Sequence, residues 1–109
     1  SLFEVVKGYS GGQTFTSSTK PGITRGNHYH TRKTERFCVI KGQAQIELRL
    51  ISEDKVHKFV VDGDNPVYID MPTFFTHNIK NIGEGELQTL FWTNEIFDSD
   101  DTDTYYQVV

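Results

Sequence analysis

The sequence predicts an all-β fold, an antiparallel sandwich or barrel in a single domain spanning residues 1–109. Three observations support this prediction. Residues 43–50 alternate strictly between apolar and polar side chains, which is typical of a strand with one buried face. No segment keeps an apolar period of 3.6 residues over three turns, so helices are not indicated. Turn-forming residues interrupt the chain about every 8 to 12 residues, as in sandwiches and barrels.

The expected elements follow in order along the chain. The first expected strand carries His28 and His30, and the polar residues 31–34 form a turn after it. A returning strand is expected from Glu35 until Gly42 ends it. The remaining expected strands cover residues 43–50, 58–61, 67–71, 74–82, 87–93 and 104–109, the last as an edge strand, with a strong turn at residues 62–66.

Composition excludes several classes of protein. The chain has 109 residues and a net charge of −4, and Arg32-Lys33 is its only basic cluster, so nucleic-acid binding is not expected. It has one cysteine, Cys38, which we expect to be a small buried residue without a disulfide. No long apolar stretch or signal peptide is present, so no membrane association is expected and a cytoplasmic location fits.

An acidic run lies near the end of the sequence. Its members are Asp98, Asp100, Asp101 and Asp103, and we expect them to form a solvated surface loop. The alternative is a second metal site formed by these carboxylates.

The most informative pattern is G-x5-H-x-H-x4-E-x6-G followed by P-x-F-x2-H-x3-N. It contains His28, His30, Glu35 and His77. Residues two apart on a strand share a face, with Cα atoms roughly 6.6 Å apart, so the first two imidazoles can converge on one ion. A hairpin would return Glu35 beside them, and His77 must come from a distant strand. Three imidazoles and one carboxylate form a complete ligand set for a divalent metal.

Two less specific interpretations remain. His57 is most simply a solvent-exposed strand or turn residue. The other three histidines could also line a pocket that uses them only for hydrogen bonding. If a metal is bound, zinc, manganese, iron and nickel all accept this ligand set.

These two motifs resemble the paired motifs of cupins, small jelly-roll barrels (double-stranded β-helices) that hold a metal near one mouth. One departure is Phe74, which stands where a glycine is typical; we expect it to change the local turn without removing His77. The runs at residues 18–30, 76–81 and 92–105 are similar to the C-terminal cupin domain of bifunctional capsular polysaccharide synthesis enzymes of the CapF family. The resemblance covers about residues 15–109.

The resemblance implies a function. In that family a cupin domain binding Zn²⁺ is thought to epimerise C3 of a UDP-linked 4-keto-6-deoxy-N-acetylhexosamine, and an N-terminal domain then reduces the keto group with NADPH. The sequence lacks the G-x-G-x-x-G pattern of an NADPH site, so we expect epimerisation without reduction. It begins at Ser1 and has only Met71, which suits the C-terminal piece of a two-domain enzyme with the reductase in cis. Cupins commonly pair, so a homodimer is expected.

Two other functions stay open, namely an Fe(II)-dependent cupin dioxygenase and a non-catalytic sugar-binding module. Epimerisation also needs acid–base groups, and no base is assigned. The residues considered are Tyr29, Lys33, Tyr68, Trp92 and Glu95. Tyr68 and Trp92 are more simply core or pocket-wall residues and Lys33 a solvated turn residue, while Tyr29 should point away from its histidine neighbours.

Overall fold

The described part of the chain folds into two five-stranded antiparallel sheets. The structure, a computed structural model, describes residues 2–8, 12–95 and 97–109. Within those ranges the strands are β1 (Leu2–Gly8), β2 (Gly12–Thr19), β3 (Thr24–Tyr29), β4 (Glu35–Lys41), β5 (Gln43–Leu50), β6 (Val56–Asp62), β7 (Tyr68–Met71), β8 (Phe75–Asn81), β9 (Leu87–Thr93) and β10 (Tyr105–Tyr106).

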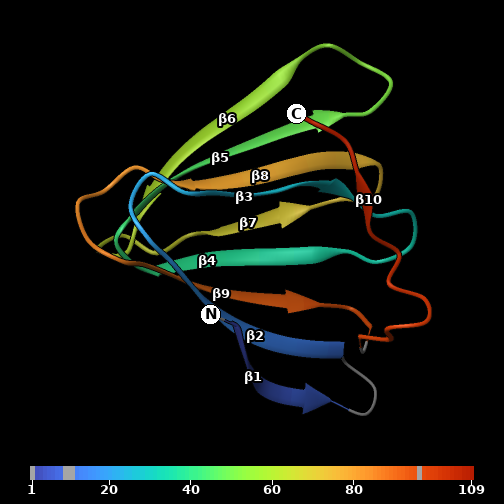
Figure 1. The fold of residues 1–109 in the computed structure, drawn as a ribbon, viewed down its shortest axis with the longest axis horizontal. Helices are drawn as coiled ribbons and strands as arrows, with labels where there is room; N and C mark the ends of the chain where they lie inside the picture. Colours follow the sequence, from blue (N-terminus) through green and yellow to red (C-terminus); the bar gives the residue numbers. More distant parts are fainter. Residues whose placement is uncertain (1, 9–11, 96) are drawn as a thin grey trace.

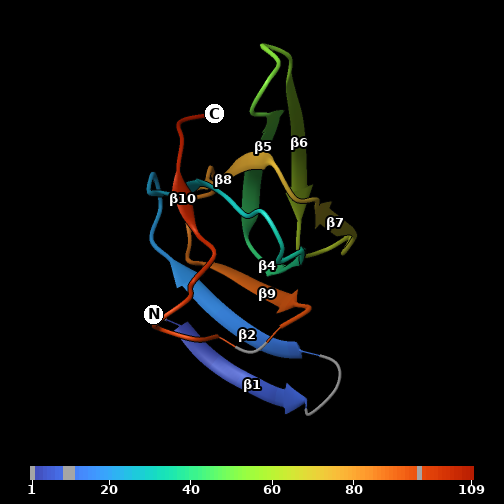
Figure 2. The ribbon, with the colours of Figure 1, turned by 90° about the vertical axis from the view of Figure 1, so that its right-hand side faces the viewer.

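The two sheets pack as the layers of a jelly roll (Figures 1 and 2). One has the order β1-β2-β9-β4-β7 and the other the order β10-β3-β8-β5-β6. Neighbours in each sheet are rarely neighbours in sequence, so strands from both ends of the chain lie beside strands from its middle. This topology lets side chains far apart in sequence meet between the layers. The expected all-β class is confirmed.

The apolar core lies between the sheets and follows the predicted alternation. Ala44, Ile46 and Leu48 of β5 are 0%, 0% and 7% exposed. Ile46 and Leu48 pack with Phe37 and Met71 from the opposite layer. A smaller cluster joins Ala44 to two further buried residues, Val39 and Leu87. Cys38 is buried, as expected.

The expected hairpin between the histidine pair and Glu35 is wrong. β3 pairs with β8 and β10, whereas β4 pairs with β7 and β9, so the two strands belong to different sheets. Residues 30–34 therefore cross from one layer to the other. Glu35 still lies beside His30, because the crossing places the start of β4 opposite the end of β3. Sequence spacing alone does not distinguish a hairpin from such a crossing.

Other boundaries differ modestly from expectation. The strands expected at residues 35–41, 43–50 and 87–93 are found with those bounds, and the turn after β6 is confirmed. The expected edge strand at 104–109 shortens to the two residues of β10, which lies at the edge of the second sheet. The sequence does not predict β1 or β2. For β2 the reason is that its Ser- and Thr-rich segment has no apolar alternation. The described ranges include no helix with the length and apolarity needed to cross a bilayer.

Candidate metal centre

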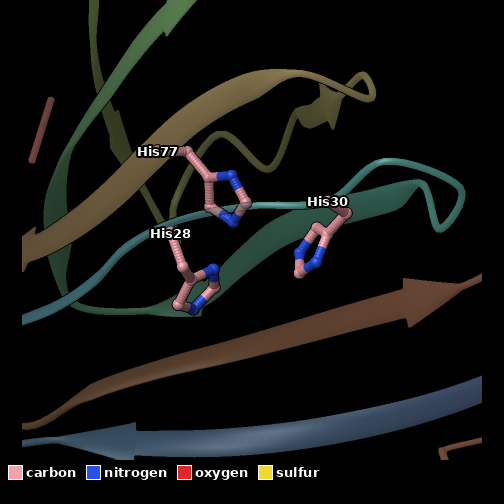
Figure 3. A group of neighbouring side chains, drawn as sticks. All are labelled: His28, His30 and His77. Atoms are coloured by element: carbon pink, nitrogen blue, oxygen red, sulfur yellow. The ribbon is translucent and has the colours of Figure 1, made fainter. Parts of the chain in front are cut away.

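Three histidines from two strands and a loop meet between the sheets. His28 and His77 come from β3 and β8, and His30 follows the last residue of β3. One ring nitrogen of each lies within 4.8 Å of the others, and His30 and His77 are each only 1% exposed. Figure 3 shows the three rings gathered around a common space. The predicted convergence of the two motifs is thus observed for the three imidazoles.

A bulge beside β8 sets the direction of His28. In the register of β3 and β8, His28 lies opposite His77, and the pairing shifts between Gly26 and His28. Gly26 and Asn27 have φ values of 104° and 60°. A Cβ at residue 26 would come within 2.8 Å of the carbonyl oxygen of His77, so only glycine fits there. Such a bulge redirects the side chains that follow it.

Backbone carbonyls fix the orientation of the other two rings. Nδ1 of His30 lies 2.8 Å from the carbonyl oxygen of Asp103, and Nδ1 of His77 lies 3.2 Å from that of Phe75. A carbonyl only accepts, so each Nδ1 carries the proton and each Nε2 keeps a lone pair. Both Nε2 atoms, together with Nδ1 of His28, are buried without a hydrogen-bond partner. Buried nitrogen atoms rarely lack a hydrogen-bond partner or a metal, so these three atoms are candidate ligands for a cation.

The electrostatics of the cluster keep two imidazoles neutral. Burial, reinforced by the neighbouring His77, lowers the pKa of His28 to about 4. Burial likewise lowers the pKa of His77. Neutral imidazole is the form that ligates metals. The donor set and its unsatisfied nitrogens therefore fit a divalent metal ion.

Glu35 lies beside the histidines, as expected, but it does not belong to the group of three converging ligand atoms. Its Oε1 lies 2.5 Å from Nε2 of His30, so this imidazole nitrogen faces the carboxylate directly. Burial alone would raise its pKa, but the adjacent His30, then His77 and Lys33, outweigh burial and lower it. Glu35 is absent from the group of three whose ligand atoms lie within 4.8 Å of one another. A carboxylate poised against one imidazole can reach a shared ion by a small side-chain rotation, and its role as a ligand remains a prediction.

The cluster opens into a cavity of about 240 Å³. Phe37 closes one side and touches His77, with ring centroids 5.8 Å apart. Hydroxyl and cationic groups contribute to the rest of the lining, namely Ser17, Thr19, Thr89, Thr104, Arg25 and Lys33. Such a lining suits a ligand rich in hydroxyl and carbonyl groups.

Only Lys33, among the five acid–base candidates, lines this cavity. The expectation that it is a solvated turn residue is therefore wrong: it is half-buried, and its Nζ donates to the carbonyl oxygen of Thr102 at 3.3 Å. Tyr29 points away from the histidines, as expected, and stacks on Tyr105 with centroids 5.4 Å apart. Glu95 forms an ion pair with Arg32, which lowers the pKa of Glu95.

Tyr68 and Trp92 are not core residues and lie outside the histidine cavity, but both line a separate pocket, as the pocket-wall expectation allows. They are 68% and 38% exposed, and Arg36 lies over the ring of Tyr68, 5.5 Å from its centroid. The sequence of β9 does not show which side chains face inward, because Leu90, Phe91 and Trp92 are all apolar. In the structure Phe91 faces the cavity and Trp92 faces outward. His57 lies in β6 as a half-buried strand residue, outside the histidine cluster.

One further expectation is corrected near the site. Asp98, Asp100 and Asp101 are exposed as expected, but Asp103 is only 4% exposed and contacts residues 31–33. The sequence does not indicate that Asp103 is buried, because its hydrogen-bond partners lie about 70 residues away and its neighbours in sequence are acidic. In the turn before β8, Phe74 adopts a φ of 65°, the left-handed conformation that glycine favours, and His77 stays in the cluster as expected.

The fold and the histidine cluster together define a cupin domain with a candidate metal centre. The cupin domain of Schizosaccharomyces pombe Cnp3 superposes with a TM-score of 0.69, covering 86% of this chain and 63% of that one at 14% identity, a likeness of fold alone. Residues 1–105 match the family described as the polysaccharide biosynthesis C-terminal domain, and the chain belongs to that family.

Two relatives are considerably more similar. The capsular polysaccharide assembling protein CapF of Staphylococcus aureus shares 39% identity and a TM-score of 0.97, over 99% of this chain and 32% of CapF. The UDP-2-acetamido-2,6-beta-L-arabino-hexul-4-ose reductase of Pseudomonas aeruginosa is 36% identical over 102 residues, 94% of this chain and 27% of that protein. The chain thus spans about a third or less of either relative.

Proposed function

We propose that this domain is the metal-dependent, zinc-binding epimerase module of a two-domain enzyme that makes surface polysaccharide precursors. The substrate would be a UDP-linked 4-keto-6-deoxy-N-acetylhexosamine, inverted at C3. The observation that carries the proposal is the set of three buried imidazole nitrogens without a hydrogen-bond partner, beside the Glu35 carboxylate and a cavity lined by both hydroxyl and apolar side chains. The name of the Pseudomonas relative, a reductase of a UDP-linked hexul-4-ose, supports a keto-sugar substrate.

The chemistry follows from the ketone. A proton on the carbon next to a carbonyl is weakly acidic, and its removal and return from the opposite face invert that carbon. A divalent cation, when bound, would polarise the carbonyl oxygen and stabilise the negative charge that develops there. His28, His30 and His77 would hold the cation, with Glu35 as the fourth ligand.

The chain's own groups would orient the sugar and move the proton. The hydroxyls of Ser17, Thr19 and Thr89 can bind sugar hydroxyl groups from the β2 and β9 side. Lys33 faces the cavity and is the candidate acid or base that remains from the five considered. A cavity of about 240 Å³ is smaller than pockets that bury a whole drug-sized ligand. We therefore expect it to take the sugar ring while the UDP moiety lies outside.

The test combines metal content with proton exchange. Elemental analysis of purified protein should find about one zinc per chain. With the keto-sugar in deuterated water, mass spectrometry should show deuterium uptake next to the ketone. His28→Ala should remove both the metal and the exchange, whereas His57→Ala, which alters a histidine outside the cluster, should keep both.

Each failure has its own meaning. Metal-replete protein that exchanges no deuterium would contradict the epimerase and leave a sugar-binding module. Oxygen consumption with Fe(II) would instead favour a dioxygenase. Exchange that persists in His28→Ala would show that the histidine cluster is not the reacting site.

Three further features are part of the proposal. The reductase would lie in cis, since the relatives are about three times as long as this chain. A homodimer follows from the resemblance to other cupins, and the cytoplasmic location stays an expectation from the sequence. Size-exclusion chromatography with light scattering tests the dimer, and expression of the full-length gene product tests the reductase.

A further inference from the structure

One residue connects the crossing loop to the histidine cluster from far along the chain. Asp103 is 4% exposed and lies in the segment before β10. Its carboxylate accepts hydrogen bonds from the backbone N–H groups of Thr31, Arg32 and Lys33 at 3.1, 2.7 and 2.8 Å. The Thr31 hydroxyl adds a fourth at 2.6 Å. Three consecutive N–H groups around one carboxylate form a cradle for an anion.

The same residue also orients a ring of the cluster. The carbonyl oxygen of Asp103 receives the Nδ1 proton of His30 at 2.8 Å. Its φ of 49°, a conformation that aspartate tolerates better than most residues, turns the carboxylate toward the loop while the carbonyl faces the imidazole. The side chain and the main chain of one residue thus bind both the loop that ends at Glu35 and the ring that contacts Glu35.

The backbone around Asp103 holds this arrangement against the second sheet. Tyr105 and Tyr106 pair with Tyr29 and His28 of β3. Beyond them, the N–H of Gln107 donates to the carbonyl of Asn27 at 2.9 Å. The carbonyl of Thr102, on the other side of Asp103, accepts from Lys33. The segment therefore touches the loop, the cavity lysine and the strand that carries His28.

We propose that Asp103 is a positioning residue for the metal centre: its carboxylate clamps residues 31–33 so that its carbonyl holds the proton on Nδ1 of His30 and turns Nε2 toward Glu35 and the candidate metal position. The inference rests on the proposed function for the metal, but the tautomer is a property of the metal-free chain. Neighbours that hydrogen-bond to a ligating histidine typically change metal affinity about 10–100-fold when removed.

Asp103→Asn gives the main test, because it keeps the size of the side chain but replaces one acceptor oxygen with an NH₂ group that faces backbone donors. In metal-free protein labelled with ¹⁵N-histidine, long-range ¹H–¹⁵N spectra should show His30 as the Nδ1–H tautomer in the wild type. Asp103→Asn should shift it toward a mixture with Nε2–H. Titration with Co(II), followed by its visible absorption, should show an affinity about 10–100-fold weaker than wild type.

Asp100→Asn is the matched control, since this exposed aspartate of the same acidic run should leave both readouts unchanged. A purely structural role predicts that Asp103→Asn lowers the melting temperature while the tautomer and Co(II) affinity stay as in the wild type. That result would overturn the inference. If the wild type binds no Co(II), the proposed function fails, and the tautomer spectra still decide the role of Asp103.

Discussion

The space between the two sheets has two halves that are built differently. The core half, between β4–β7 and β5–β6, is filled by apolar side chains such as Ile46 and Met71, both 0% exposed. The site half, between β2–β9 and β3–β8, keeps a cavity, whose lining combines hydroxyl and charged residues and three imidazoles with the apolar side chains of Phe37, Ile79 and Phe91. The same strand pairing thus supports a filled interior on one side and a hollow one on the other.

The difference shows what holds each half in place. Apolar burial is non-directional and stabilises the core half by about 25 cal/mol per Å². The site half lacks that filling, so its geometry depends on directional bonds, such as those from Asp103 and from the carbonyl of Phe75. Damage to one half should therefore change stability, and damage to the other should change ligand geometry.

The largest expected effect comes from the core half. Ile46→Ala should lower the free energy of unfolding by about 2–5 kcal/mol, because Ile46 is fully buried and a cavity would remain. Urea denaturation measures this loss, and folded Ile46→Ala should keep the Co(II) affinity of the wild type. Val60→Ala, at a position 68% exposed on neighbouring β6, is the control and should change stability by less than about 0.5 kcal/mol. Weakened Co(II) binding in folded Ile46→Ala would show that the halves are not independent.

A smaller effect is expected in the site half, at the bulge in β3. Gly26→Ala should lower stability by about 1–3 kcal/mol through backbone strain. It should also weaken Co(II) binding, because the new Cβ would push against the carbonyl of His77. Gly22→Ala is a matched control: Gly22 also has a positive φ, 78°, but no atom lies within 4 Å of its Cβ position. Equal Co(II) affinities for the two variants would contradict the role of the bulge.

The smallest effect concerns acid. The pKa of His28 in the folded state is about 4 and that of His77 is also lowered, so the unfolded chain binds more protons below about pH 6.5. Stability of the metal-free protein should therefore fall as the pH drops from about 6.5 toward 4. Urea midpoints at several pH values measure the slope, which should be shallower in His28→Gln than in the wild type. Stability that rises on acidification would refute the assignment of neutral imidazoles.

Local patterns predicted the parts of this molecule that depend on local geometry. The H-x-H spacing correctly placed His28 and His30 together, and the alternation of β5 predicted its buried face. Both follow from the period of two in a strand. The convergence of His77 with them came from the paired motif, since strand pairing between residues so far apart is set by topology.

What the sequence did not predict depends on partners that are distant along the chain. Glu35 reached His30 by a crossing between sheets and not by a hairpin, and the local turn signal is the same for both. Asp103 was placed with the solvated acidic run because its three donors belong to residues 31–33. The sequence places Lys33 in solvent for the same reason: the cavity that Lys33 lines is formed largely by strands distant from it in sequence.

The position of Asp103 near the end of the sequence also matters for how the protein matures during translation. A translation product that stops before this residue contains every histidine of the cluster but lacks the groups that orient His30. Incomplete chains would therefore bind the metal more weakly even if most of the barrel had already formed. Because Asp103 is translated after all three histidines, the orientation of His30 would be completed only when nearly the whole domain has been synthesised.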